Sequence, residues 1–350
     1  MRKGVPSAGA GPALGEIDAA DPVARSGGAR PSWSLDPLGL LERYGILALW
    51  VIVIVVFGLL TPSTFLTFAN FQTILGTQAV LLFITLGLLI PLTAGEFDLS
   101  VANTMNFGAV MVGYLNVNAG WPLLPAITGA LACGLLVGAA NALLVVTVGV
   151  PSLVATLGTG TLIYGLGYGI TNSTTIGGIS QNLINASTSQ VIGLPLTFFY
   201  GIALCAILWY VFDFTPLGRY LVFVGEGREV ARLSGLRVDA IRAGALIACA
   251  LVATIAGVLQ DGVVGAATPD AGPSYLLPAF AGAFLGQTAI NPGRFNPWGT
   301  TVAVYFLVTG ITGLELLGQG GWVQDVFYGG SLILAVTFGR LAAKRRAATG

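Results

Sequence analysis

The fold class of this chain is indicated most clearly by residues 79–108, AVLLFITLGLLIPLTAGEFDLSVANTMNFG. This stretch begins with an apolar run and then breaks at a short sequence with two carboxylates, Glu96 and Asp98. These are the only charged residues between Arg43 and Asp213. A membrane-spanning helix needs about 20 apolar residues, so this region holds about six crossings. The sequence therefore predicts an all-α protein, a polytopic bundle of transmembrane helices.

The composition excludes most other classes. Hydrophobic residues make up 55% of the 350 residues and charged residues only 9%, against about 25% in soluble domains. The 15 basic and 15 acidic residues balance, so the chain offers no basic face for a nucleic acid. It has no histidine, and its three cysteines lie in apolar runs without disulfide or zinc-ligand spacing. We expect no metal site.

Breaks at clusters of Gly, Pro and Asn divide the apolar sequence into about ten predicted spans. These are residues 44–61, 71–94, 99–117, 122–148, 151–171, 195–213, 243–265, 274–290, 298–318 and 321–340. Two of the breaks, near 95–108 and 286–299, predict interrupted helices.

The spans form a predicted transmembrane domain, residues 43–341. Before it we expect a flexible cytoplasmic extension, residues 1–42, and after it a basic cytoplasmic tail, residues 342–350. The polar segment 172–194 is uncharged and rich in turn formers, which predicts an external loop.

The basic residues determine the predicted orientation. Ten spans that start inside place residues 1–43, 214–242 and 340–350 on one face of the membrane. Every Lys and Arg except Arg294 lies in these three regions, and parity places Arg294 on the same face. Because Lys and Arg accumulate on the cytoplasmic side, we expect both termini and the segment 214–242 in the cytoplasm.

The break TAGEFDLSVANTMNFG, residues 93–108, is the first candidate site. An ionised group at bilayer depth is unfavourable unless it is paired or faces water. Glu96 and Asp98 could cap a helix at the membrane surface, since Asp98 precedes a helix start. Alternatively, they line a translocation pathway together with Ser100, Asn103 and Asn106, or form a proton relay.

Other polar side chains within the spans point to the same pathway. Thr156, Thr159 and Gln287 could line a wet path for a hydroxylated solute. Each could equally form a hydrogen bond to a neighbouring helix, which is the commoner role of such residues in membranes.

The segment 214–242 is the only long charged connection between predicted spans. Within it, EVARLSG predicts a short helix with Val230 and Leu233 on one side and Glu229 and Arg232 on others. Gly235 stands where a helix would stop. Such a helix could lie on lipid or dock into a partner protein, and its mixed charges favour the partner.

The chain lacks the motifs of an enzyme. It contains no P-loop sequence, and its only lysines, Lys3 and Lys344, lie in the two tails. No nucleophile and base pattern is present either. We therefore expect no cofactor, no catalytic residues and no nucleotide site of its own.

Three stretches resemble the ribose-type, or monosaccharide-type, permease subunits of bacterial ABC importers. GEFDLSVANTMNFGAVM from Gly95 resembles the family's G-G-[IV]-D-L-S-V-G segment, and VPSLVATLGTGTLIYGLG from Val150 resembles its P-P-F-I-V-T-L-G-T stretch. TPLGRYLVFVGEGREVARLSGLRV from Thr215 resembles its T-x-[FY]-G-R-Y…A-A-R-L-S-G-I connection and is the most specific of the three. The likeness extends from about residue 44 to residue 346.

The resemblance implies partners. In such importers a cytoplasmic E-A-A-x-x-x-G element docks into the ATPase subunit, and Glu229, Ala231 and Gly235 match its first, third and seventh positions, with Val230 in place of the second alanine. The implied ATPase-coupling residues are Glu226, Glu229, Ala231, Arg232, Leu233 and Gly235. Two permease chains, identical or different, would pair in the lipid of the bacterial inner membrane. Separate ABC ATPase subunits and an extracytoplasmic substrate-binding protein would complete the importer.

The chain departs from the family pattern at two places. Glu96 replaces the usual second glycine of the first motif, and Gln287 and Asn291 stand in GQTAINPGRFN, where the family often has G-G-T-S-L-S-G-G-R-G.

The leading hypothesis is the permease subunit of an ATP-driven importer for a small hydroxylated solute, above all a monosaccharide. The alternative is a secondary transporter or facilitator that uses Glu96 and Asp98 to couple transport to an ion.

Overall fold

The computed structural model describes Met1 and residues 37–349, with side chains for Met1 and residues 43–341. Most of the predicted extension, residues 2–36, lies outside the described residues, as do the side chains of the predicted tail, residues 342–350. The first helix begins at Pro37, before the predicted domain boundary at residue 43.

Helices form most of the described chain, as the hydropathy predicts. They are α1 (Pro37–Leu60), α2 (Pro62–Phe65), α3 (Phe68–Thr77), α4 (Ala79–Thr93), α5 (Val101–Gly113), α6 (Leu123–Ala142), α7 (Ser152–Thr171), α8 (Gln181–Thr188), α9 (Leu196–Phe214), α10 (Pro216–Glu226), α11 (Arg228–Leu233), α12 (Val238–Val264), α13 (Pro273–Gly286), α14 (Pro297–Leu316) and α15 (Trp322–Thr349). Two π-helical turns, Tyr114–Asn118 and Leu143–Val148, extend α5 and α6. Four short strands form two antiparallel pairs, β1 (Ile176–Gly177) with β4 (Ala266–Ala267) and β2 (Gln190–Val191) with β3 (Leu194–Pro195).

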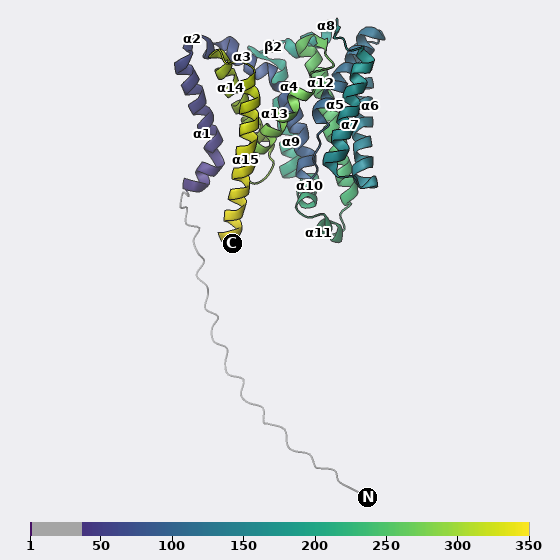
Figure 1. Ribbon diagram of the computed structural model, residues 1–350, viewed down its shortest axis with the longest axis vertical. Helices are drawn as coiled ribbons and strands as arrows, with labels where there is room; N and C mark the ends of the chain where they lie inside the picture. Colours follow the sequence, from purple (N-terminus) through teal and green to yellow (C-terminus); the bar gives the residue numbers. More distant parts are fainter. Residues whose placement is uncertain (2–36, 350) are drawn as a thin grey trace. The chain divides into compact units, whose positions relative to one another are not determined.

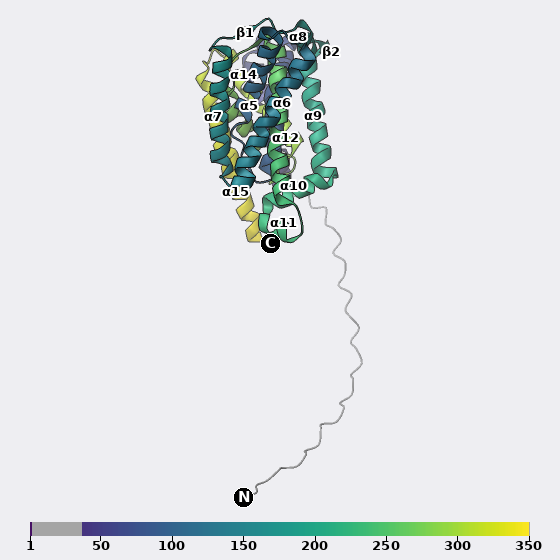
Figure 2. The ribbon, with the colours of Figure 1, turned by 90° about the vertical axis from the view of Figure 1, so that its right-hand side faces the viewer.

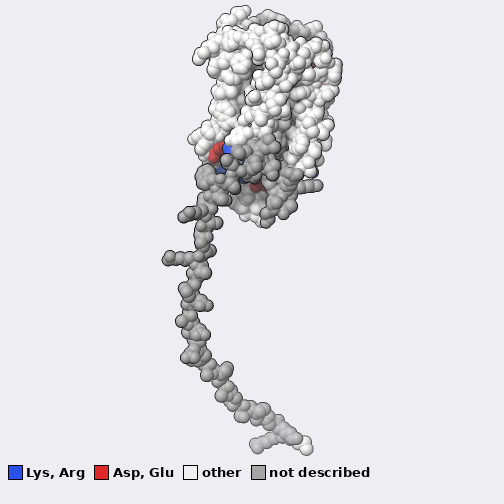
Figure 3. All heavy atoms as spheres, turned by 90° about the vertical axis from the view of Figure 1, so that its left-hand side faces the viewer, with Lys and Arg blue, Asp and Glu red and all other residues white. Residues whose placement is uncertain are grey.

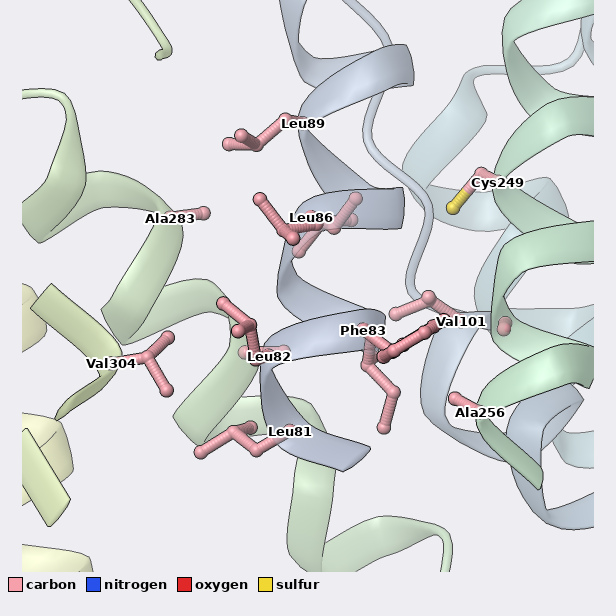
Figure 4. Packing of buried hydrophobic residues seen from close by; sticks show 14 of the residues in the cluster. Leu81, Leu82, Phe83, Leu86, Leu89, Val101, Cys249, Ala256, Ala283 and Val304 are labelled. Carbon is pink, nitrogen blue, oxygen red and sulfur yellow. The ribbon is translucent and has the colours of Figure 1, made fainter. Parts of the chain in front are cut away.

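The core is built around α4 and α12. Every residue of α4 from Ala79 to Leu92 is buried, which explains why this helix is apolar on all sides. Figure 4 shows leucines of α4, among them Leu82, packed between Val304 of α14, Ala283 of α13 and Ala256 of α12. The helix α12 packs in turn against α5 and α6.

Glycines let α12 approach its neighbours closely. A Cβ on Gly138 of α6 would lie 2.8 Å from the Cα of Ile247, and a Cβ on Gly257 of α12 would lie 2.7 Å from the amide nitrogen of Ala109. Without side chains at these positions the backbones make direct contact, which is the usual way in which helices associate in lipid.

The predicted number of about ten spans is wrong. Among the described residues, seven helical segments are long and apolar enough to cross a membrane: Arg43–Leu60, Phe68–Thr93, Leu123–Val148, Ser152–Thr171, Leu196–Phe214, Val238–Val264 and Pro297–Leu316. The three other predicted spans correspond to α5, α13 and α15. The helix α13 has only 14 residues. The helix α5 with its π-helical turn contains several asparagines, and the continuous helix α15 carries polar residues and glycines near its start, so both segments are less apolar than the seven spans. The chain is nonetheless a multi-pass helical membrane protein.

Both predicted breaks are present. One separates α4 from α5 over residues 94–100, and the other separates α13 from α14 over residues 287–296. The predicted external loop 172–194 contains β1, α8 and β2, so part of it is folded.

The ends of the helical unit, residues 37–349, differ in what they carry. Figure 1 shows the start of α1, the helix α11 and the end of α15 at one end of this unit, while β2 and α8 lie at the other. Figure 2 gives the same arrangement for α11, β1 and α8. On the face shown in Figure 3, most of the described surface is free of charge, and the charged side chains that are visible gather toward the lower end. This distribution is expected of a bundle that lies in lipid.

Candidate functional site

The break between α4 and α5 forms because α4 ends in a glycine turn. Gly95 has a φ of 75°, in the left-handed region. The amide of Gly95 donates to the carbonyl of Leu92 at 3.1 Å, and the amide of Glu96 donates to the carbonyl of Pro91 at 2.9 Å. This pair of bonds is a Schellman motif, which satisfies the last carbonyls of α4 and turns the chain. The turn brings Glu96 to the end of α4.

Glu96 is buried and paired with two arginines. Its Oε1 accepts a hydrogen bond from Nε of Arg242 at 2.5 Å and another from a terminal nitrogen of Arg228 at 2.7 Å. Arg228 also donates to the carbonyl of Gly95 at 3.1 Å. Only 1% of Glu96 is exposed, so its charge depends on these partners. The Glu96 carboxylate is thus held by Arg228 and Arg242, both of which belong to the charged segment 214–242.

Asp98 is also buried, but no cation of the described residues pairs with it. Its Oδ1 accepts from the amide of Ser100 at 2.9 Å and from the Ser100 hydroxyl at 2.5 Å. The Cys249 thiol of α12 also lies against the carboxylate, while Oδ2 accepts no other hydrogen bond from the described groups. Ser100 is the residue directly before α5. Asp98 therefore orders the chain at the start of α5, as a capping residue does.

The polar residues after Asp98 tie the start of α5 to α6, to α7 and to the loop before α13. The Ser100 hydroxyl accepts from Nδ2 of Asn141 in α6 at 2.8 Å. Nδ2 of Asn103 donates to the carbonyl of Gly160 at 3.1 Å, and that of Asn106 donates to the carbonyl of Pro269 at 2.6 Å. In each of the three asparagines, the side-chain oxygen Oδ1 has no hydrogen-bond partner among the described groups.

The two predicted threonines of α7 behave differently from each other. The Thr156 hydroxyl accepts from the amide of Leu99 at 2.9 Å and so binds the break directly. The Thr159 hydroxyl donates only to its own helix, to the carbonyl of Ala155 at 2.9 Å. Thr156 belongs to the polar cluster of the break, and Thr159 lies one turn further along α7.

Gln287 belongs to the second break. Its Nε2 donates to the carbonyl of Gly293 at 3.4 Å, and no hydrogen bond among the described side chains joins it to the polar cluster at Asp98. The residue that holds this break is Asn296, which the sequence-based prediction missed. Asn296 donates to the carbonyls of Gly286 and Ala289 at 3.2 and 3.0 Å, and its Oδ1 accepts from the amide of Gly299 at 2.6 Å. An Asn directly before the Pro of a helix start is the sequence signal that identifies it.

The predicted short helix of the charged segment is α11, and it ends as expected. Gly235 has a φ of 82°. Its amide donates to the carbonyl of Arg232 at 3.0 Å, and the amide of Leu236 donates to the carbonyl of Ala231 at 3.1 Å, a second Schellman motif. Ala231 is fully buried against Val224 and Val238, which attaches the helix to α10 and α12.

The opposite side of α11 faces away from the bundle. Leu233 is 87% exposed and Val230 is 57% exposed, three residues apart on one side of the helix. Glu226, Glu229 and Arg232 are exposed around them, and Arg232 forms an ion pair of 3.3 Å with the exposed Asp239. The exposed side of α11 therefore consists of an apolar pair surrounded by charged side chains.

The arginine partners of Glu96 could not be identified from the sequence. Arg228 and Arg242 lie 132 and 146 residues from Glu96 in the chain. The sequence offers only an indirect signal. A carboxylate in an apolar region requires a partner, and the segment 214–242 carries five arginines on the face of the membrane near which the break was predicted to lie.

Comparison with known proteins identifies the family. Residues 70–336 match the family described as branched-chain amino acid transport system / permease component. The chain is 28% identical over 303 residues to the D-allose transport system permease protein of Escherichia coli strain K12, covering 87% of this chain and 93% of that protein. It is 30% identical to the ribose import permease protein of Bacillus subtilis strain 168, covering 86% and 94%. It is also 26% identical to the xylose transport system permease protein of Escherichia coli strain K12, covering 87% and 93%.

No solved structure matches the chain. The family match covers most of the described helices, and it includes both breaks and the segment that carries α11. The resemblance that the three sequence stretches indicated is confirmed by relatives that are permeases for ribose, allose and xylose. The chain belongs to the family of branched-chain amino acid transport system / permease components.

Proposed function

We propose that this chain is the membrane permease subunit of an ATP-driven importer of a monosaccharide. The observation that carries the proposal is the exposed pair Val230 and Leu233 on α11, at the end of the bundle that also holds the start of α1. Relatives of this length are permeases of sugar transport systems. The sequence contains no P-loop motif, so in this proposal a separate ATPase supplies the energy, and α11 is the surface that we assign to it.

The remaining parts of the importer follow from the same proposal. The ATPase subunits would bind α11 from the cytoplasm, which places the start of α1 and the end of α15 on the cytoplasmic side, in agreement with the positive-inside pattern. A substrate-binding protein would deliver the sugar at the opposite end, near α8. A second permease chain would complete the pathway in the bacterial inner membrane.

The test of this proposal is reconstituted transport. We expect proteoliposomes that contain the chain, its ATPase subunits and its binding protein to take up labelled ribose, allose or xylose only when ATP is present on the ATPase side. Non-hydrolysable ATP analogues should give no sustained uptake. Sugar uptake at the full rate by the chain alone would contradict the proposal.

The ion-coupled alternative has less support, because the Glu96 carboxylate is already paired with two arginines and is not free to bind a coupling ion. Asp98 provides a direct test. In Asp98→Asn the side-chain oxygen can still accept both hydrogen bonds from Ser100, so we expect uptake within about twofold of the wild type. In Asp98→Ala the Ser100 amide and hydroxyl are buried without their acceptor, which should destabilise the fold by about 1–3 kcal/mol.

Thermal unfolding of the purified variants and ATP-driven uptake measure the two effects. A folded Asp98→Asn variant that has lost uptake would show instead that transport depends on the negative charge.

A further inference from the structure

The turn that carries Glu96 is in direct backbone contact with the end of α10. A Cβ at Gly95 would lie 3.4 Å from the Cα of Gly225, and a Cβ at Gly225 would overlap the carbonyl oxygen of Thr93. Two glycines thus allow the end of α4 and the end of α10 to touch without side chains between them. The residue that follows this contact by three positions is Arg228, the first residue of α11.

Arg228 forms a second connection to this turn, from α11, through a hydrogen bond and an ion pair. It binds both the Gly95 carbonyl and the Glu96 carboxylate, and the buried Arg242 of α12 holds the same carboxylate oxygen. The side chains of Glu96 and Arg242 are 2% and 11% exposed, whereas that of Arg228 is 47% exposed. The pair Glu96 and Arg242 is therefore fixed inside the bundle, while Arg228 reaches it from the exposed α11. A shift of α11 moves the Arg228 guanidinium relative to a buried charge, which is energetically unfavourable unless the turn follows.

The other side of the turn is fixed to the transmembrane helices. The amide of Phe97 donates to the Ser152 hydroxyl at 3.2 Å, and the amide of Leu99 donates to the Thr156 hydroxyl at 2.9 Å, both on α7. The Asp98 carboxylate binds Ser100, whose hydroxyl in turn accepts from Asn141 of α6. One continuous chain of contacts runs from α11 through Glu96 to α6 and α7.

We propose that Glu96 is a positioning residue for transport, and that it transmits displacement of α11 to the break between α4 and α5 and from there to α7. The inference rests on the proposed function, since it requires that an ATPase moves α11. It assigns to Glu96 a mechanical role in place of solute or ion binding. The short helix α11 suits this role, because it is joined to its neighbours by an extended residue, Gly227, and a left-handed one, Gly235.

The experiment measures sugar transported per ATP hydrolysed in the reconstituted importer. We expect Glu96→Gln to lower this ratio by about tenfold while ATP hydrolysis continues, within the range of known coupling between sites. Arg228→Ala should lower it in the same direction. Combining the two changes should add little to the effect of Glu96→Gln, since both remove the same interaction, the ion pair between Glu96 and Arg228. Arg228→Lys, which keeps the charge, should retain a higher ratio than Arg228→Ala.

The ratio separates transmission from mere loss of folded protein, because fewer assembled importers would lower transport and hydrolysis equally. Arg228 is half-exposed, so Arg228→Ala decides the question even if Glu96→Gln fails to assemble. Arg340→Ala is the matched control: it removes an exposed arginine at the same end of the bundle that forms no ion pair among the described residues. Its ratio should equal that of the wild type.

The outcomes distinguish this inference from the proposed function. If the wild type imports sugar with ATP and Arg228→Ala keeps its ratio, the transmission role of Glu96 is overturned and the importer assignment stands. If the wild type transports without ATP, the proposed function fails first.

Discussion

Replacing Leu233 by Asp is expected to abolish ATP-driven sugar uptake, with a loss of about 100-fold or more. Leu233 is 87% exposed on α11, so the substitution removes few contacts within the chain and should leave its folding intact. In the proposed complex this side chain enters the ATPase interface, where an unpaired carboxylate costs several kcal/mol to bury. A loss of about 3 kcal/mol of binding corresponds to roughly a hundredfold weaker complex. Co-purification of the ATPase and ATP-driven uptake are the two measurements.

Leu317→Asp is the control for this prediction. Leu317 is 41% exposed and directly follows α14. The segment before α14 lies near the start of α1, because the amide of Ile290 donates to the carbonyl of Arg43. The helix α14 runs away from this end, so Leu317 lies at the opposite end of the bundle. This variant receives the same charge but should still retain the ATPase. Normal uptake by Leu233→Asp would show that the ATPase binds elsewhere.

Replacing Gly257 by Leu should produce the largest loss of stability, about 3 kcal/mol or more. A Cβ at this position would overlap the carbonyl oxygen of Met105 and would lie 2.7 Å from the amide nitrogen of Ala109. Both atoms belong to the backbone of α5, so no side-chain rotation can relieve the clash, and α5 must move away from α12. Thermal unfolding of the purified protein in detergent measures the effect.

The same substitution on the same helix provides its control. Gly244 of α12 is exposed, and a Cβ at this position would have no atom within 4 Å apart from the adjacent backbone of its own helix. Gly244→Leu should therefore leave stability unchanged or slightly higher, because Leu favours helix over Gly. Equal unfolding temperatures for the two variants would show that α5 and α12 do not pack through Gly257.

Local properties of the sequence were sufficient for several predictions. The apolar runs identified the membrane bundle, because lipid accepts only segments whose backbone is hydrogen bonded internally. Gly235 predicted the end of α11, because a glycine in the left-handed conformation closes a helix regardless of what surrounds it. Motifs around Gly95, Val150 and Thr215 indicated the family that the comparisons confirm.

The number of spans was overestimated for a physical reason. Hydropathy measures how apolar a segment is, but not whether the helix continues. The segment that became α13 is apolar enough to resemble a span, yet this helix has only 14 residues. The segment that became α5 and its π-helical turn is long enough, but it includes Asn103, Asn106, Asn116 and Asn118. Burial inside the bundle, as at Met105 of α5 and Phe280 of α13, gives a short helix the same apolar character as contact with lipid.

Hydropathy and turn chemistry act over a few residues, so the amino-acid sequence was sufficient to predict a helical membrane protein, the places where its helices break and the short charged helix between α10 and α12. The partners of the charges in the break became known only from the folded structure. Glu96 is bound by arginines 132 and 146 residues away, and Asn106 by a carbonyl 163 residues away. Such partners are brought together by the packing of α4, α5 and α12, and no local property of the sequence encodes which buried polar groups will meet.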